Sequence, residues 1–145
     1  MEIKNTMKLI NNLIYDIGLH KSEDTSYYLK KGFKVIAFEA DPELVLECKN
    51  KFYQEIKNKK LIIIEGAIVD KERLLDKTIK FYKNLGTNSL EIEVPTVNIS
   101  KCYKKYGIPH YLKVDIEGAD LICLEALLEF KDKPNYISIE SEKVN

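Results

Sequence analysis

Residues 13–42 read LIYDIGLHKSEDTSYYLKKGFKVIAFEADP, and this stretch decides the fold. Two short apolar runs, at 13–17 and 33–39, flank a helical pattern over 23–31 that Gly32 closes. A strand, a helix and a second strand in this order are typical of a βαβ unit, whose two strands pair in parallel. The sequence therefore predicts an α/β fold built on a parallel sheet.

The same alternation continues along the rest of the chain. Further patterns follow at 42–56 (helix), 60–65 (strand), 98–106 (helix), 111–116 (strand), 119–130 (helix) and 135–140 (strand). Residues 78–97 break this rhythm, and we expect an inserted hairpin there, with strands over 78–82 and 91–97. The expected architecture is a single Rossmann-like domain over 1–145, with a mostly parallel sheet flanked by helices.

Composition narrows the class of protein. The 145 residues are 45% hydrophobic and 32% charged, which suits one globular domain, and the formal net charge is zero. A dedicated nucleic-acid-binding protein would normally carry a basic excess. The apolar runs are too short for a signal peptide or a membrane span, and the three cysteines lack the spacing of a zinc site. We expect a cytoplasmic protein with no nucleic-acid, membrane or metal partner.

Acidic residues gather where the predicted strands end. Ligands of open α/β sheets bind outside the carboxyl ends of the strands. Glu39 follows Asp16 by 23 residues, at the place where a carboxylate accepts hydrogen bonds from both hydroxyls of a ribose. The alternative is that Glu39 is only a solvated acid before the next helix. Gly18 is expected where the chain turns close to the ligand. The strand-end acids are Asp16, Glu39, Glu65, Asp115 and Glu140.

The glycine pattern distinguishes between two nucleoside-bearing cofactors. A dinucleotide fingerprint, G-x-G-x-x-G, would need glycines at 18, 20 and 23, but His20 and Glu23 occupy two of these positions. Glu23 would also bring negative charge to a helix N-terminus that should bind a pyrophosphate. S-adenosylmethionine has no phosphate and carries an ammonium, a carboxylate and a sulfonium, so acids near its amino-acid end are favourable. The residues therefore favour S-adenosylmethionine, and an NAD-dependent oxidoreductase is the weaker alternative.

Six segments of the chain are similar to the FkbM family of methyltransferases. They are YDIGLHKSEDT (15–25), VIAFEADP (35–42), GAIVDKE (66–72), VPTV (94–97), YLKVDIEGAD (111–120) and YISIE (136–140). The resemblance implies a class I methyltransferase fold that uses S-adenosylmethionine. It further implies methylation of a hydroxyl oxygen on a small-molecule or glycan acceptor.

The resemblance also implies roles for individual residues. Asp16 and Gly18 would line the methionine end of the cofactor, Glu39 would hold the ribose, and Ala67 would lie by the adenine. Asp115 and Glu117 would face the reacting centre. His20 and Ser22 lie in the first loop and are counted with the cofactor-binding residues, as is Asp115. The alternative for His20 is a solvated loop histidine with no part in binding. Ser22 stands where the family normally has a second glycine.

The acids after residue 114 leave several alternatives open. Asp115 or Glu117 could remove the proton of the acceptor hydroxyl or orient the acceptor. Together with Asp120 they could instead offer oxygen ligands to a cation such as magnesium. Asp120 could also serve only the dipole of the helix that it begins.

One departure from the family concerns the end of the chain. Folds of this type usually add two more strands after the position of Glu140, and we expect these to be lacking, as in a truncated form. An open sheet edge would then be available for pairing. A non-catalytic or truncated cofactor-binding module of the same fold is therefore the alternative to an active enzyme.

Overall fold

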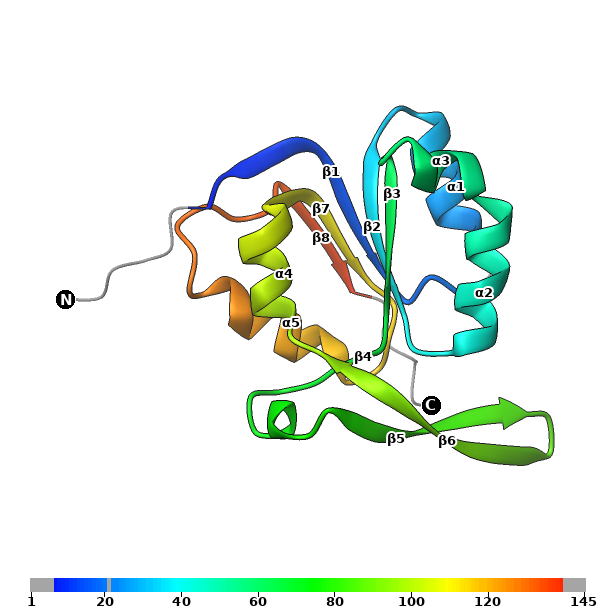
Figure 1. Ribbon diagram of the computed structural model, residues 1–145. Helices are drawn as coiled ribbons and strands as arrows, with labels where there is room; N and C mark the ends of the chain where they lie inside the picture. The colour runs from blue at the N-terminus through cyan, green and yellow to red at the C-terminus, as the bar shows by residue number, and fades with distance from the viewer. Residues whose placement is uncertain (1–6, 21, 140–145) are drawn as a thin grey trace, which may run out of the picture.

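A computed structural model describes residues 7–20 and 22–139 (Figure 1). The helices are α1 (Glu23–Lys30), α2 (Pro42–Lys51), α3 (Tyr53–Lys57), α4 (Ile99–Tyr106) and α5 (Ala119–Leu127), with a 3-10 turn η1 (Arg73–Leu75). The strands are β1 (Leu9–Ile17), β2 (Lys34–Glu39), β3 (Leu61–Glu65), β4 (Ala67–Ile68), β5 (Thr78–Leu85), β6 (Asn88–Val97), β7 (Ile108–Val114) and β8 (Tyr136–Ile139).

The main sheet has the strand order β3-β2-β1-β7-β8, and all of its neighbouring pairs are parallel. Helices α1, α2 and α3 lie on one face, and α4 and α5 lie on the other (Figure 1). This arrangement confirms the predicted α/β fold. The chain proceeds from β1 outward to β3 and later returns to place β7 on the other side of β1. The strand order therefore switches between β1 and β7, where such sheets bind their ligands.

Strand β1 contributes side chains to both faces of the sheet. Tyr15 and Ile17 belong to the core under α4 and α5, and Ile14 belongs to the core on the side of α1 and α2. The Tyr15 hydroxyl donates hydrogen bonds to the carbonyl oxygens of Cys102 and Gly107, 3.1 and 2.8 Å away. Because side chains alternate along a strand, the position after Tyr15 faces α1.

The predicted hairpin is present and longer than expected. Strands β5 and β6 pair antiparallel from Thr78↔Pro95 to Leu85↔Asn88, which leaves a two-residue turn. Gly86 begins this turn with φ +80°, a conformation that tight hairpin turns require at this position. The short strand β4 extends the hairpin by pairing with β6 in parallel. Neither β4 nor η1 was predicted, because two or three residues show no periodicity.

Two strands of the main sheet have different limits from those predicted. β1 and β7 both start earlier, because Leu9 pairs with Ile108 ahead of a register irregularity. β7 ends at Val114, so Asp115 lies in the loop that follows it. Strand β8 ends at Ile139 on the edge of the described sheet, and Glu140 lies outside the described residues. Among the helices that the structure describes, none has the length and apolar character needed to cross a membrane.

Candidate functional site

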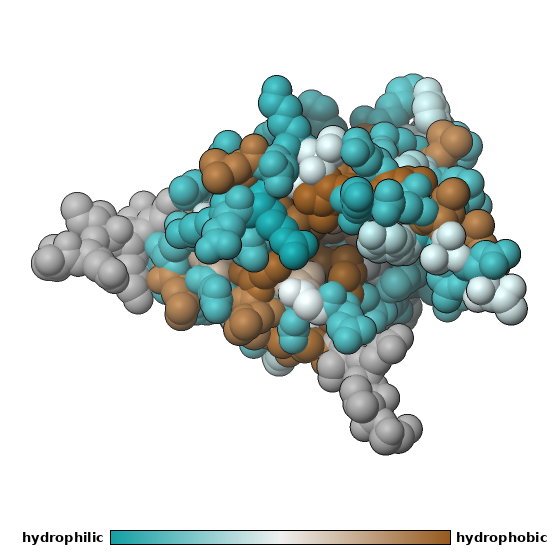
Figure 2. Space-filling view, turned by 90° about the horizontal axis from the view of Figure 1, so that it is seen from below, coloured by the Kyte–Doolittle hydropathy of each residue, from teal (hydrophilic) through white to brown (hydrophobic). Residues whose placement is uncertain are grey.

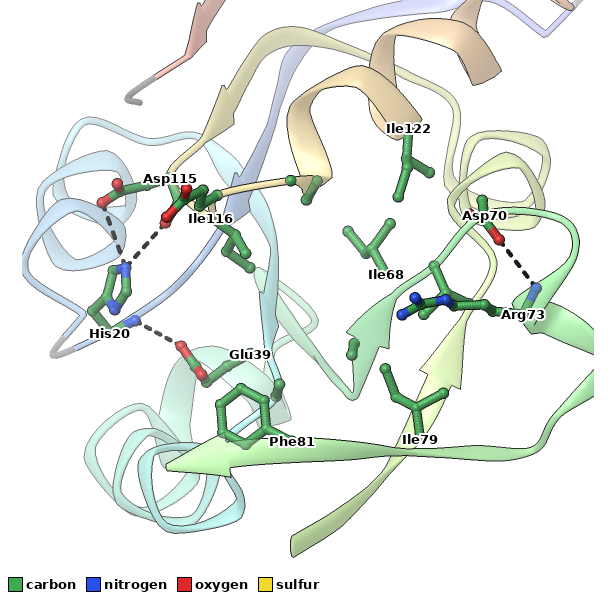
Figure 3. Close-up of a pocket in the computed structure, with 16 residues that line it drawn as sticks. His20, Glu39, Ile68, Asp70, Arg73, Ile79, Phe81, Asp115, Ile116 and Ile122 are labelled. Carbon is green, nitrogen blue, oxygen red and sulfur yellow. Dashed lines mark hydrogen bonds and ion pairs between the residues drawn. The ribbon is translucent and has the colours of Figure 1, made fainter. Parts of the chain in front are cut away.

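A cavity of about 810 Å³ lies at the carboxyl ends of the main sheet, next to the β5–β6 hairpin (Figure 3). Its lining combines residues that follow β1, β2 and β7 with residues from β4, η1 and β5. Figure 2, seen from the side of the hairpin, shows hydrophobic surface enclosed by hydrophilic residues. The cavity thus occupies the predicted ligand position, and the hairpin supplies a wall that a parallel sheet alone would lack.

Glu39 lies at the edge of this cavity, and backbone groups hold its carboxylate on both sides. Oε1 accepts the N–H of His20, and Oε2 accepts the N–H of Asp41, each at 3.0 Å. The residue is 6% exposed, which does not fit the alternative of a solvated acid. A carboxylate has about four lone-pair sites, so each oxygen can still accept another hydrogen bond.

His20 connects the end of β1 with the end of β7. Its backbone has φ +50°, and its Nε2 lies 3.2 Å from the carbonyl oxygen and 3.5 Å from Oδ2 of Asp115. Both residues line the cavity, and in Figure 3 they lie together on one side of it. The structure therefore brings together His20, Glu39 and Asp115 at the cavity, while the His20 side chain remains 58% exposed.

Gly18 takes part in the same junction for a different reason from the predicted one. Its φ is +94°, and a Cβ atom placed there would lie 2.7 Å from the carbonyl oxygen of Asp115. The glycine therefore allows the chain after β1 to pass close to the backbone after β7. It is not among the residues that line the cavity.

Asp16 is buried on the α1 side of β1 and does not line the cavity. Its Oδ2 accepts a 2.6 Å hydrogen bond from the Thr25 hydroxyl, whereas Oδ1 has no hydrogen-bond partner within the described part of the chain. Burial raises the pKa of the carboxyl to about 6. Asp16 pairs in register with Lys113 of β7, which forms an ion pair with Asp24. The sequence predicted Asp16 at the strand end but not its position beneath the cavity surface.

Ser22 is also buried and does not line the cavity. It precedes α1 with φ +70° and ψ +19°, and its hydroxyl accepts a hydrogen bond from the ammonium of Lys51 at 3.2 Å. Glycine adopts this left-handed conformation without a steric cost, which explains why glycine suits the position. Ser22 therefore shapes the loop before α1 and does not contribute to the cavity lining.

Ala67 lines the cavity, and the glycine before it fixes how the chain enters β4. Gly66 has φ +140°, and a Cβ atom there would lie 2.6 Å from the carbonyl oxygen of Pro95 and 2.7 Å from Cγ2 of Val97. This close approach packs the end of β3 against β6. The contact therefore joins the main sheet to the hairpin.

The acids after β7 separate into two groups. Asp115 and Glu117 line the cavity, Asp115 partly buried and Glu117 exposed. Asp120 lies in the first turn of α5, outside the lining, where its charge complements the helix dipole. Within residues 7–20 and 22–139, no group of three His, Cys, Asp or Glu side chains is placed to hold a metal ion.

A family model described as the methyltransferase FkbM domain matches residues 16–145. The chain belongs to the FkbM methyltransferase family. The solved structure of methyltransferase FkbM from Methylobacillus flagellatus KT resembles this FkbM domain, with a TM-score of 0.51 and 17% sequence identity. The match covers 88% of this chain and 30% of that one, so the chain spans less than a third of its relative's length. None of the curated proteins compared with the chain matches it.

Several lining residues of this FkbM domain were not predicted from the sequence. Asp70 and Arg73 come from the segment after β4, and Ile79 and Phe81 come from the inward face of β5. The Asp70 carboxylate accepts the backbone N–H of Arg73 at 3.0 Å. These residues reach the cavity only because the hairpin folds back toward the main sheet, and the positions of the strand ends in the sequence do not predict that fold-back. The one sequence signal that could have pointed to this segment is that it contains the chain's single arginine.

An ion-pair cluster fastens the outer part of the hairpin to the main sheet. The ammonium of Lys83 in β5 lies 3.3 Å from Oδ1 of Asp41 and 2.6 Å from Oε2 of Glu43. Asp41 is the N-cap of α2 and accepts the N–H of Glu43. Because the N–H of Asp41 also donates a hydrogen bond to Glu39, Asp41 contacts both the hairpin and the carboxylate at the cavity.

Proposed function

We propose that this chain binds S-adenosylmethionine in the cavity and transfers its methyl group to a hydroxyl oxygen of a small molecule or glycan. The observation that carries the proposal is a cavity at the strand-order switch whose lining holds four carboxylates, in a chain of a methyltransferase family. A volume of about 810 Å³ suits a ligand of this size. The four lining acids are Glu39, Asp70, Asp115 and Glu117.

The described residues fit the cofactor group by group. Glu39, held by two backbone N–H groups, would accept the ribose hydroxyls, and Ala67 would lie by the adenine. His20 and Asp115 would enclose the methionine end. Oδ1 of Asp16, which has no hydrogen-bond partner among the described residues, would add buried negative charge that favours a cationic ligand. Gly18 and Ser22 would shape the loop between these groups. When bound, the cofactor supplies an electrophilic methyl group on a sulfonium.

The residues after β7 would bind the acceptor and remove its proton. We assign to Asp115 and Glu117 the binding of the acceptor hydroxyl, whose proton one of the two carboxylates takes. Glu117 is exposed at the mouth of the cavity, whereas Asp115 is partly buried and contacts His20. Holding the acceptor oxygen in a fixed orientation lowers the barrier by removing the entropic cost of alignment from the reaction step.

The first turn of α1 and the cysteines bear on the oxidoreductase alternative and on the cellular setting. Glu23 and Asp24 lie in the first turn of α1, where their charges would repel the pyrophosphate of a dinucleotide. This disfavours the oxidoreductase alternative. The three cysteines, at 48, 102 and 123, are buried and free. We therefore propose a reducing, cytoplasmic setting.

Calorimetric titration with S-adenosylhomocysteine, S-adenosylmethionine and NAD tests the cofactor. We expect both adenosyl ligands to bind and Glu39→Gln to weaken their binding at least tenfold, because a charge-assisted pair of hydrogen bonds is lost. Glu65→Gln is the matched control, since Glu65 ends the neighbouring strand in register with Glu39 but lies outside the cavity lining. Binding of NAD alone, or equal affinities for Glu39→Gln and the wild type, would contradict the proposal.

A further inference from the structure

Arg73 is the single arginine of the chain, and its side chain enters the cavity. Figure 3 shows it running between Ile68 and Ile79, with the guanidinium turned toward the side where Glu39 and Phe81 lie. The Asp70 carboxylate binds the backbone N–H of Arg73 and so fixes the start of η1, from which this side chain projects. The backbone of Arg73 is therefore held in place, and its exposed side chain lines the cavity.

Acids surround Arg73 in the sequence, but its guanidinium forms no ion pair with any residue that the structure describes. Asp70, Glu72 and Asp76 all lie within three residues of Arg73, yet no ion pair of Arg73 occurs in the portion of the chain that the structure describes. Every other charged residue of the lining is an acid. A cation that reaches into an acid-lined cavity without forming an ion pair remains available to a ligand.

Negative and positive side chains lie on opposite sides of the cavity. Asp115 and its partner His20 occupy one side, and Arg73 occupies the opposite side, among isoleucine side chains (Figure 3). The methionine arm of S-adenosylmethionine carries a sulfonium, an ammonium and a carboxylate, so its net charge is positive and it prefers the acidic side to the guanidinium. With the ribose at Glu39, the methionine arm therefore extends toward His20 and Asp115. The base, attached on the other side of the ribose, then extends toward Arg73.

We infer that Arg73 recognises the adenine of the cofactor by stacking its guanidinium plane on the ring. This inference rests on the function proposed above and adds a residue that determines specificity for the base. A planar guanidinium stacks on aromatic and nucleobase rings, which a lysine ammonium does not do. The same cation repels a cofactor bound in the reversed orientation, so Arg73 also sets the direction in which the ligand binds.

Nuclear magnetic resonance tests the contact directly, because selective ¹⁵N-arginine labelling gives one side-chain Nε–H signal in this chain. We expect S-adenosylhomocysteine and adenosine to move this signal upfield through the ring current. Methionine and inorganic phosphate should leave it in place. By calorimetry, Arg73→Gln and Arg73→Lys should each bind S-adenosylhomocysteine about tenfold more weakly. The neighbouring Lys71→Gln, which keeps the cavity lining intact, should match the wild type.

The outcomes separate this inference from the proposed function. If S-adenosylhomocysteine binds with wild-type affinity to both Arg73 variants and does not move the signal, the role of Arg73 is overturned and the methyltransferase proposal stands. If phosphate moves the signal and adenosine does not, Arg73 binds an anion and the inference is overturned. If S-adenosylhomocysteine does not bind the wild-type chain, the proposed function fails, and with it the role of Arg73.

Discussion

Substitution of Asp16 by asparagine should make the protein more stable at neutral pH. The carboxyl is 1% exposed, its Oδ1 has no partner in the described region, and burial raises its pKa from 3.8 to about 6. The folded state therefore holds the proton more tightly than the unfolded state does. Well below the unfolded pKa of 3.8 the group is protonated in both states, and as the pH rises through 6 the folded state must accept a buried charge.

The size of the effect follows from the shift in pKa. A difference of about two pKa units at 1.36 kcal/mol per unit corresponds to about 3 kcal/mol. Because asparagine does not titrate, the stability of Asp16→Asn relative to the wild type should rise by about 2 kcal/mol between pH 4 and pH 7.5, since the unfolded carboxyl is already partly ionised at pH 4. Comparing the two proteins across pH removes the constant effects of the substitution, such as a changed hydrogen bond to Thr25.

Urea unfolding of both proteins at pH 4, 5, 6 and 7.5 measures this difference. Asp120→Asn serves as a control, because that acid is only partly buried in the first turn of α5. A stability difference between Asp16→Asn and the wild type that does not change with pH would refute the reasoning. We also expect Asp16→Asn to bind S-adenosylmethionine more weakly, since the buried carboxylate favours a ligand with net positive charge.

Two further substitutions test how the hairpin is attached to the sheet. Gly66→Ala should lower the free energy of unfolding by about 3 kcal/mol, because its Cβ would clash with the Pro95 carbonyl. In the control Gly32→Ala the added Cβ meets open space, so the free energy of unfolding should fall by only about 1 kcal/mol. Equal losses for the two variants in urea unfolding would contradict the clash. Lys83→Met should release S-adenosylhomocysteine severalfold faster in stopped-flow measurements, because it removes the ion pairs to the start of α2. Lys80→Met, on the other face of β5, should not change this rate, and equal rates for both variants would show that the ion pairs do not retain the ligand.

Much of the site could be predicted from the sequence because parallel strands place their carboxyl ends at one edge. Asp16, Glu39 and Asp115 each lie at the end of an apolar run, and the helix predicted from residue 42 begins there in the structure. These signals are local, since each depends on a few neighbouring residues and on the periodicity of a strand or helix. The family resemblance rested on the same segments, and the family model confirms it.

The sequence by itself determined the parallel sheet, the hairpin at 78–97 and the acids at the strand ends. The tertiary structure alone decided which of these acids reach the cavity, because the alternation of side chains along β1 turns Asp16 under α1 while the loop after β7 leaves Asp115 in the lining. It also decided that the hairpin folds back beneath the sheet and brings Arg73 to the cavity. That approach depends on contacts between distant residues, such as Lys83 with Glu43, which no local pattern specifies.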